Sequence, residues 1–325
     1  MELNYIEQWL PEASVKYNDG SPAINLGLII TVFFKDGHTQ SIRNKMAECA
    51  DRYYAEFHSR LKKTQLYRWH RITANNYNKK RTELIEMTEE QKFAWHLTGA
   101  KELAHAPDYD LFMMTQRVFH NEAGRTIIKL TFPFAFLREP EGLTRYEEWV
   151  LWLCNAFKVE SGYAGLAFVP PLGITETENI FPWEYVRAKR FPGVIVDSHS
   201  SFEGRLAVEG IKSACWYTIL GHSWLKKLTG ENHFQSKLIN SESIELLHYN
   251  GGLILKTGRL PPPLGEVSCE ELPVGLVKVN SIIKSIRFNK PYSLHAYAPK
   301  KYAQFDEESS MRWFSRFDEA NIELD

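Results

Sequence analysis

One apolar run near the N-terminus constrains the fold more than any other feature of this sequence. Residues Ile24 to Phe34 are mostly apolar and include several β-branched side chains, which is typical of a buried strand. The Asp36-Gly37 pair that follows predicts a turn. From Thr39 to Lys62, apolar residues recur every three or four positions, as they do along an amphipathic helix. The chain is therefore expected to open with a buried strand, a turn and a long helix.

Further helices and strands are indicated by caps, periodicity and turn residues. The pairs Thr88 with Gln91 and Thr144 with Glu147 have the spacing of a capping box, which marks the start of a helix. The expected elements are helices beginning at these two caps, strands over 111–119 and 127–137, a loop or weak helix over 170–193, and a last helix over 306–320. Pro133, inside the second of these strands, suggests an edge position or a bulge.

The order of these elements predicts the fold class. Several strands follow one another through short turns, which favours an α+β fold with antiparallel or mixed sheets flanked by helices over a doubly wound parallel sheet. The chain has 325 residues, enough for about two structural units. The loop around Pro140 and Gly142 lies near the middle, so we expect two subdomains, residues 1–140 and 141–325.

The charges of the chain nearly balance, because 39 Lys and Arg face 40 Asp and Glu and leave a net charge of -1. This argues against binding nucleic acid through overall charge. Residues 60–81 depart from the balance, with eight basic residues, no acidic ones, and aromatic residues between them. They are either a nucleic-acid patch or the basic end of a helix followed by a solvated loop. We expect the second, and therefore no direct contact with nucleic acid.

The sequence predicts an intracellular protein without a metal or cofactor. Cys49, Cys154, Cys215 and Cys269 are far apart and form no CxxC or Cys/His cluster, as expected for reduced thiols of a cytosolic protein. The N-terminal sequence lacks a basic and then apolar leader, and no apolar run approaches the about 18 residues of a membrane span. We therefore expect a cytoplasmic location and no membrane partner.

Two residue clusters offer hydrolase hypotheses. Ser223 lies in a Gly-His-Ser-Trp-Leu sequence between a predicted strand and a predicted helix, but Leu225 replaces the closing Gly of a nucleophile elbow. Asp197, His199 and Glu203 follow a short predicted strand and have side chains that can ligate a metal. A polar turn explains the same spacing. A hydrolase centred on Ser223, or on a metal held by Asp197 and His199, is the alternative to a protein that only binds.

Several segments carry motifs of a known family. They are 160–168, 190–197 and 209–221, together with the opening strand, the Tyr53-Tyr54 helix and residues 130–133. The strongest is 209–221, which contains Gly-Ile-Lys, a Trp and Leu-Gly before a short helix that ends at Gly230. Over roughly residues 24–258 the chain resembles the bacterial type VI secretion immunity proteins, a TsiV-like family. These motifs are structural rather than catalytic.

The resemblance implies an immunity protein, not an enzyme, that binds one cognate effector toxin in a 1:1 complex and neutralises it. Similar members are paired with nuclease effectors of the restriction-endonuclease type, which implies a cytoplasmic DNase whose active site or DNA-binding cleft is occluded. Acidic side chains with an aromatic anchor suit such a positively charged cleft. Two stretches qualify: Glu176, Glu178, Trp183, Glu184 and Tyr185 on the Pro-bounded connection, and Asp306, Glu307 and Glu308 at the start of the last helix. We prefer the first stretch, because a long loop can reach into a cleft.

Overall fold

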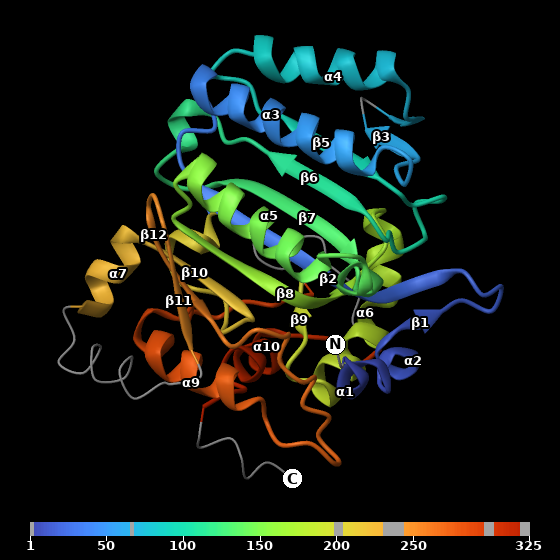
Figure 1. Ribbon diagram of the computed structural model, residues 1–325, viewed down its shortest axis with the longest axis vertical. Helices are drawn as coiled ribbons and strands as arrows, with labels where there is room; N and C mark the ends of the chain where they lie inside the picture. The colour runs from blue at the N-terminus through green and yellow to red at the C-terminus, as the bar shows by residue number, and fades with distance from the viewer. Residues whose placement is uncertain (1–2, 66–67, 198–203, 230–243, 296–301, 319–325) are drawn as a thin grey trace.

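One long sheet organises the computed structural model of this protein, which describes residues 3–65, 68–197, 204–229, 244–295 and 302–318 (Figure 1). Its strands within these residues are β1 (Val15–Lys16), β2 (Pro22–Phe34), β3 (Lys63–Gln65), β4 (Trp69–Arg71), β5 (Ala94–Thr98), β6 (Asp110–Met114), β7 (Thr126–Pro133), β8 (Ser161–Val169), β9 (Ile195–Val196), β10 (Tyr217–Gly221), β11 (Glu245–Tyr249) and β12 (Gly252–Lys256). They pair in the order β11-β12-β10-β8-β2-β7-β6-β5-β3-β4, with β1 beside β2 and β9 beside β8. The pairs are antiparallel, except that β9 runs parallel to β8.

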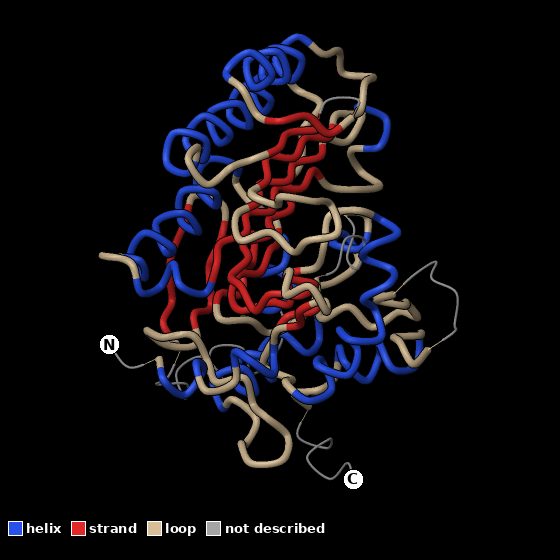
Figure 2. The backbone as a smooth tube through the Cα atoms, turned by 90° about the vertical axis from the view of Figure 1, so that its right-hand side faces the viewer, coloured by secondary structure: helices blue, strands red, loops and turns tan. Residues whose placement is uncertain are grey.

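Helices lie on both sides of the sheet, as Figure 2 shows, which confirms the predicted α+β class. The helices among the described residues are α1 (Asn4–Glu7), α2 (Leu10–Ala13), α3 (Gln40–Phe57), α4 (Ala74–Glu86), α5 (Gly142–Phe157), α6 (Ile174–Arg190), α7 (His222–Thr229), α9 (Val274–Ile283) and α10 (Glu307–Phe314), with 3-10 turns η1 (Val118–His120), η2 (Phe134–Arg138), η3 (Leu206–Val208) and η4 (Lys284–Ile286). α3, α4 and α5 cover one face, and α6 packs against β2 and β9 from the other. Within the described ranges, none of these helices combines the length and apolar character needed to cross a membrane.

β2 lies at the centre of the sheet and contains the apolar run predicted as a strand. It pairs with β7 on one side and β8 on the other, and nearly all of its side chains are buried. A strand that is covered on both faces has no reason to alternate polar with apolar residues. Asp36 forms the expected turn with a φ of 63°, and the Thr39 side chain caps α3 by accepting a hydrogen bond from the Ile42 N–H. The opening prediction is therefore confirmed, although the helix ends at Phe57.

Buried phenols attach α3 and α5 to this sheet. Tyr53 of α3 donates a hydrogen bond to the Thr131 carbonyl of β7 at 3.0 Å, and Tyr146 of α5 donates one to the Ile29 carbonyl of β2 at 2.6 Å. Burial raises the pKa of both hydroxyls well above the ordinary value, so both remain neutral donors. Trp149 of α5 packs edge-on against Tyr53, with ring centroids 6.0 Å apart. The helix predicted from Thr144 exists as α5, but it begins at Gly142 with Glu141 as its N-cap residue, so the predicted capping box at Thr144 was wrong.

The prediction of a helix beginning at Thr88 was wrong. The Thr88 N–H does donate to the Gln91 side chain at 2.8 Å, but this contact closes a turn after α4 has ended. The following residues form β5, in which Trp95 and Leu97 are fully buried. A short apolar segment fits a helix or a strand equally well, and pairing with β6 decided its conformation.

The two predicted strands at 111–119 and 127–137 exist as β6 and β7, but both are shorter. β7 ends where η2 begins, and η1 lies between β6 and β7. The expectation of an edge position or a bulge at Pro133 was wrong, because β7 lies between β2 and β6. Pro133 is the last residue of β7, a position at which a missing N–H does not interrupt the ladder.

The predicted subdomain boundary falls between η2 and α5. One sheet spans the two segments, since β2 from residues 1–140 pairs with β8 from residues 141–325. The division into two subdomains stays a prediction.

The Gly-Ile-Lys motif at 210–212 marks a close approach of two main-chain segments. The Ile211 N–H donates to the Ile286 carbonyl at 2.9 Å, and the Phe288 N–H donates to the Ile211 carbonyl at 2.8 Å. A Cβ on Gly210 would lie 2.5 Å from the Cα and N atoms of Phe288. Glycine is therefore the residue that fits here without displacing main-chain atoms.

We expect Gly210→Ala to lower the free energy of unfolding by about 1 to 3 kcal/mol, the usual cost of overpacking, because the added methyl group meets rigid backbone. Gly124→Ala is the matched control, since its Cβ would make an ordinary contact of 3.5 Å with the Gln116 side chain. Urea denaturation of both variants beside the wild type measures the difference. Equal stability of the two variants would contradict the clash.

Candidate partner-binding surface

The first group of predicted partner residues lies on α6, a regular helix of 17 residues where a loop or weak helix was predicted. Its buried positions recur at helical spacing: Thr177, Ile180, Phe181, Glu184 and Ala188. Prolines before and after this segment, and Pro182 within it, obscured that spacing in the sequence, because proline lacks the N–H that an interior helical position donates. Glu176 in the first turn and three basic residues in the last turn suit the helix dipole. The expectation of a long loop that reaches into a cleft was therefore wrong.

The predicted residues near the middle of α6 point in different directions. Trp183 is 40% exposed. Tyr185 is half-buried and packs edge-on against Phe305, with ring centroids 4.9 Å apart. Glu184, between them, is fully buried, and its Oε2 lies 2.8 Å from Nε2 of His295. Glu184 therefore holds the helix in place instead of facing solvent.

The second predicted group opens α10. Asp306 is the N-cap residue, and its carboxylate accepts a hydrogen bond from the Ser309 N–H at 2.9 Å in a capping box. Glu307 and Glu308 are exposed in the first turn, where the helix dipole favours negative charge. The helix predicted over 306–320 is shorter in the structure, and its last two positions lie outside the described residues.

The structure brings the two groups onto one surface, which we call the α6 ridge. Phe305, next to the α10 cap, touches Tyr185, while Trp183 on the other side of α6 meets Tyr17 edge-on with ring centroids 5.9 Å apart. Val186, one turn after Trp183, is 57% exposed. The α6 ridge is Tyr17, Glu176, Glu178, Trp183, Tyr185, Val186, Asp306, Glu307 and Glu308. Val186 and Tyr17 were missed from the sequence, and recognising α6 as a helix would have revealed Val186 beside Trp183.

Three acidic side chains of the α6 ridge lack an ion-pair partner among the described residues, while Glu308 pairs with Arg312. Glu176, Glu178 and Glu307 form no ion pair with another described residue. Of the cations at the end of α6, Arg190 pairs with two glutamates, Arg187 donates to the Trp183 and Ser14 carbonyls, and Lys189 lies over the Tyr185 ring. The ridge therefore combines exposed apolar side chains with free carboxylates, a combination that suits a basic protein partner.

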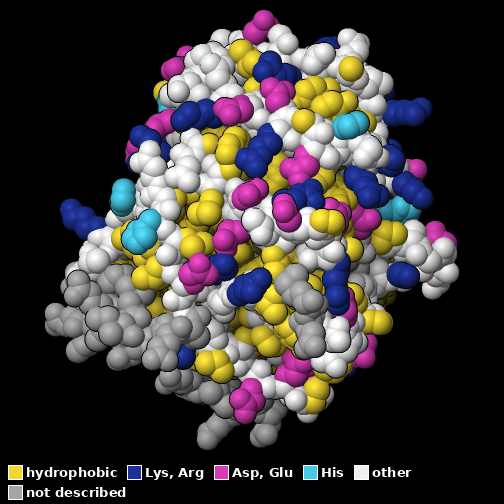
Figure 3. Space-filling model, in the orientation of Figure 1, with side chains coloured by type: hydrophobic (Ala, Val, Ile, Leu, Met, Phe, Trp, Pro, Cys, Tyr) yellow, Lys and Arg dark blue, Asp and Glu magenta, His cyan; other side chains and the backbone are white. Residues whose placement is uncertain are grey.

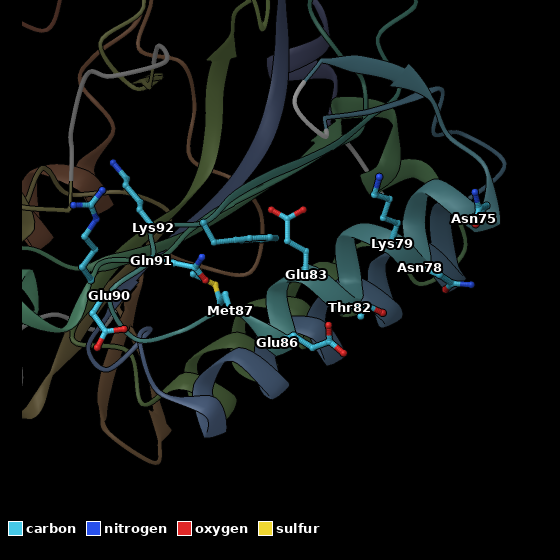
Figure 4. Close-up of a pocket in the computed structure, with 12 residues that line it drawn as sticks. Asn75, Asn78, Lys79, Thr82, Glu83, Glu86, Met87, Glu90, Gln91 and Lys92 are labelled. Carbon is cyan, nitrogen blue, oxygen red and sulfur yellow. The ribbon is translucent and has the colours of Figure 1, made fainter.

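A groove of about 1060 Å³ runs along α4, which lies above α3 at the top of the molecule in Figure 1, whereas α6 lies lower, at the right (Figure 4). Its walls carry both charge signs: Glu83, Glu86 and Glu90, with Lys79, Lys92 and Arg117. The face seen in Figure 3 is similarly mixed, with basic and acidic side chains interspersed. Charge alone therefore does not favour a basic or an acidic partner at this groove.

The basic segment of residues 60–81 also differs from its prediction. It forms the hairpin of β3 and β4 and most of α4, rather than a helix end and a solvated loop. Lys80 is buried and pairs with Glu83 at 2.9 Å. The Tyr77 ring stacks on Tyr54, with centroids 4.2 Å apart. Some of the basic and aromatic side chains of this segment therefore make contacts within the protein and are not available to a partner.

Comparison with known proteins identifies the family. Residues 45–317 match the family model TsiV, described as type VI immunity for VRR-NUC. This chain belongs to the TsiV family. A solved structure described as Pseudomonas aeruginosa T6SS protein PA0821 is similar to it, with a TM-score of 0.79 and 19% sequence identity over 95% of this chain and 89% of that one, which shows a shared fold. No curated protein matches the sequence.

Membership in the TsiV family confirms the resemblance inferred from the motifs. It makes the protein a type VI secretion immunity protein, whose role is effector inhibition, and it names VRR-NUC as the effector class.

In this TsiV protein, the lysine of the Gly-Ile-Lys motif belongs to a buried ion-pair cluster. Lys212 Nζ lies 2.9 Å from one carboxylate oxygen of Asp197, and Lys129 Nζ lies 2.9 Å from the other. The Tyr163 hydroxyl also donates to this carboxylate, at 2.7 Å. Burial by itself raises the pKa of Asp197, but the two ammonium groups and the hydroxyl outweigh it and hold that pKa below its ordinary value. The cluster ties β7 and β8 to the chain on either side of η3.

The residues of the two hydrolase hypotheses do not come together in a catalytic arrangement within the part of the chain that the structure describes. The carboxylate of Asp197 is occupied by the cluster, while His199 and Glu203 lie outside the described residues. Elsewhere in the described ranges, His, Cys, Asp and Glu form no group of three or more that could hold a metal. Ser223 is exposed at the second position of α7, and no described residue is hydrogen-bonded to its hydroxyl. These placements give the hydrolase alternative no specific support.

We expect Asp197→Asn to lower the free energy of unfolding at neutral pH by about 3 kcal/mol, because two buried ammonium groups lose their counter-charge. The pKa of Asp197 is lower in the folded chain than in the unfolded one. Its contribution is therefore present above the unfolded pKa of about 4 and is lost as the pH falls below it. The difference in free energy of unfolding between wild type and variant should decrease as the pH is lowered from about 5 to about 3. Urea denaturation across this range is the measurement, and a gap that does not change with pH would count against the cluster.

Proposed function

We propose that this TsiV protein binds one VRR-NUC effector in a 1:1 complex in the cytoplasm and neutralises it by occluding its active site or DNA-binding cleft. Family membership supports the class of effector. The observation that supports the mode of binding is the α6 ridge, where free carboxylates surround exposed aromatic and aliphatic side chains. A nuclease binds the phosphate backbone through cations, so its cleft carries the charge that these carboxylates complement.

The shape of the α6 ridge suits this task, because an outward-facing helix can enter a concave cleft. Trp183 and Val186 provide an apolar centre, and buried aromatic anchors commonly contribute most of the binding energy at an interface. A stable complex buries about 800 Å² on each partner, which is more than one helix offers. The start of α10 and Tyr17 extend the surface on either side. Glu184 is left out of direct contact, since its side chain is buried.

We expect a catalytically inactivated VRR-NUC effector, taken from the gene beside the one for this chain, to form a stoichiometric complex with the purified protein. Light scattering after size-exclusion chromatography should give the mass of a 1:1 complex. The active effector should kill cells when expressed alone and spare them when this protein is co-expressed. Toxicity that persists beside the well-expressed protein, with no complex formed, would overturn the proposed function.

We expect Trp183→Ala combined with Val186→Ala to weaken the Kd for this effector by about 100-fold, the scale of a central hot spot. Charge reversal by Glu176→Lys with Glu178→Lys should slow association, and the effect should diminish at high salt. Titration calorimetry and stopped-flow mixing measure the two quantities.

The α4 groove provides the matched control for this test. Glu86 and Glu90 are exposed glutamates there, so Glu86→Lys with Glu90→Lys changes the net charge by the same amount as reversal on the ridge. We expect this control to bind the effector as the wild type does. Loss of binding in the groove variant, with normal binding by the ridge variants, would place the contact at the groove instead.

A further inference from the structure

A buried Glu–His pair lies directly beneath the α6 ridge. The side chains of Glu184 and His295 are both 0% exposed, and Nε2 of the imidazole lies 2.8 Å from Oε2 of the carboxylate. The imidazole stacks on Phe181 of α6, with ring centroids 4.0 Å apart and planes 4° from parallel. Its other nitrogen, Nδ1, accepts a hydrogen bond from the Phe305 N–H at 3.2 Å. Because Nδ1 acts as an acceptor, Nε2 carries the proton, and the Nε2–H group donates a hydrogen bond to Glu184.

These contacts join the two halves of the ridge. Phe305 immediately precedes the Asp306 cap of α10, so the imidazole connects α6 to the point where α10 begins. The Tyr185 ring reinforces this connection by packing on Phe305. A further bond ties the imidazole's own segment to α10, because the Leu294 N–H donates to the Ser310 hydroxyl at 3.0 Å.

The chemistry of the pair indicates more than space filling. A buried carboxylate is costly unless its partners compensate for the lost water. Oε1 of Glu184 is buried and has no hydrogen-bond partner among the described residues. An apolar side chain would fill the same space without that cost. What the carboxylate provides, and an apolar residue would not, is a directional contact that orients the imidazole and, through it, Phe305.

We infer that Glu184 and His295 are positioning residues for effector binding. They hold the start of α10 against α6, so that Glu307 and Glu308 face the same partner as Trp183 and Val186. This inference rests on the proposed function. It also explains why Glu184 matters to the ridge although the effector does not touch its side chain.

The first test compares affinities for the inactivated VRR-NUC effector. Glu184→Ala removes the acceptor of the imidazole proton and should weaken the Kd by about tenfold, the loss expected when part of an interface is misplaced. Glu184→Gln keeps an acceptor oxygen and should stay within about twofold of the wild type. His295→Asn keeps an acceptor near Phe305 but removes the contact with Glu184, and it should match the alanine variant. This third variant answers the question if Glu184→Ala does not fold.

A double-mutant cycle separates positioning from general stability. A background with Glu307→Ala and Glu308→Ala lacks the two exposed glutamates that the pair positions, so Glu184→Ala should cause little further loss of affinity there. Ile254→Ala is the stability control, because this residue is fully buried in β12. It should lower the melting temperature and leave the Kd unchanged.

The outcomes distinguish the two levels of the proposal. If the wild type neither binds nor silences the effector, the proposed function fails. If the wild type binds and Glu184→Ala binds equally well, the positioning inference alone is wrong. The same conclusion follows if Glu184→Ala loses as much affinity in the Glu307/Glu308 background as it does alone.

Discussion

The pairing of β2 with both β7 and β8 is the constraint on which the rest of this structure depends. β2 is 13 residues long, and its two neighbours come from opposite sides of the predicted subdomain boundary. Because β2 is buried, helices must cover both of its faces, with α5 on one side and α6 on the other. The outward orientation of the α6 ridge therefore follows from how one apolar strand is paired.

Two buried carboxylates then hold segments that are distant in the sequence, and they do so by different chemistry. Asp197 is compensated by two ammonium groups and a phenol, so it remains charged and ties the family's Gly-Ile-Lys motif to the sheet. Glu184 meets an imidazole whose second nitrogen is occupied by a main-chain N–H. The first contact supports the fold of this chain by joining β7 and β8 to the segments before and after η3. The second joins the two parts of the surface proposed to meet the effector.

Local patterns predicted the elements whose periodicity was long. The apolar run of β2, the helical periodicity of α3 and the aromatic face of α5 all have the predicted conformation, whereas neither predicted capping box begins a helix. The helix prediction failed at residues 94–98 because a five-residue apolar segment fits the period of a helix or of a strand. Pairing with β6 determined that it is a strand. The conformation of α6 was not predicted, because its prolines were taken as signs of a loop although its apolar residues recur at helical spacing.

The sequence by itself determined the α+β class, the central strand and, through its motifs, membership in the TsiV family, because each depends on local pattern. It also identified most residues of the α6 ridge by their chemistry. Only the tertiary structure decided that Trp183 and Val186 face outward, that Glu184 turns inward to His295, and that the start of α10 lies beside them. Adjacent residues on a helix point about 100° apart, so the packing of α6 against the sheet determines which of them a partner can reach.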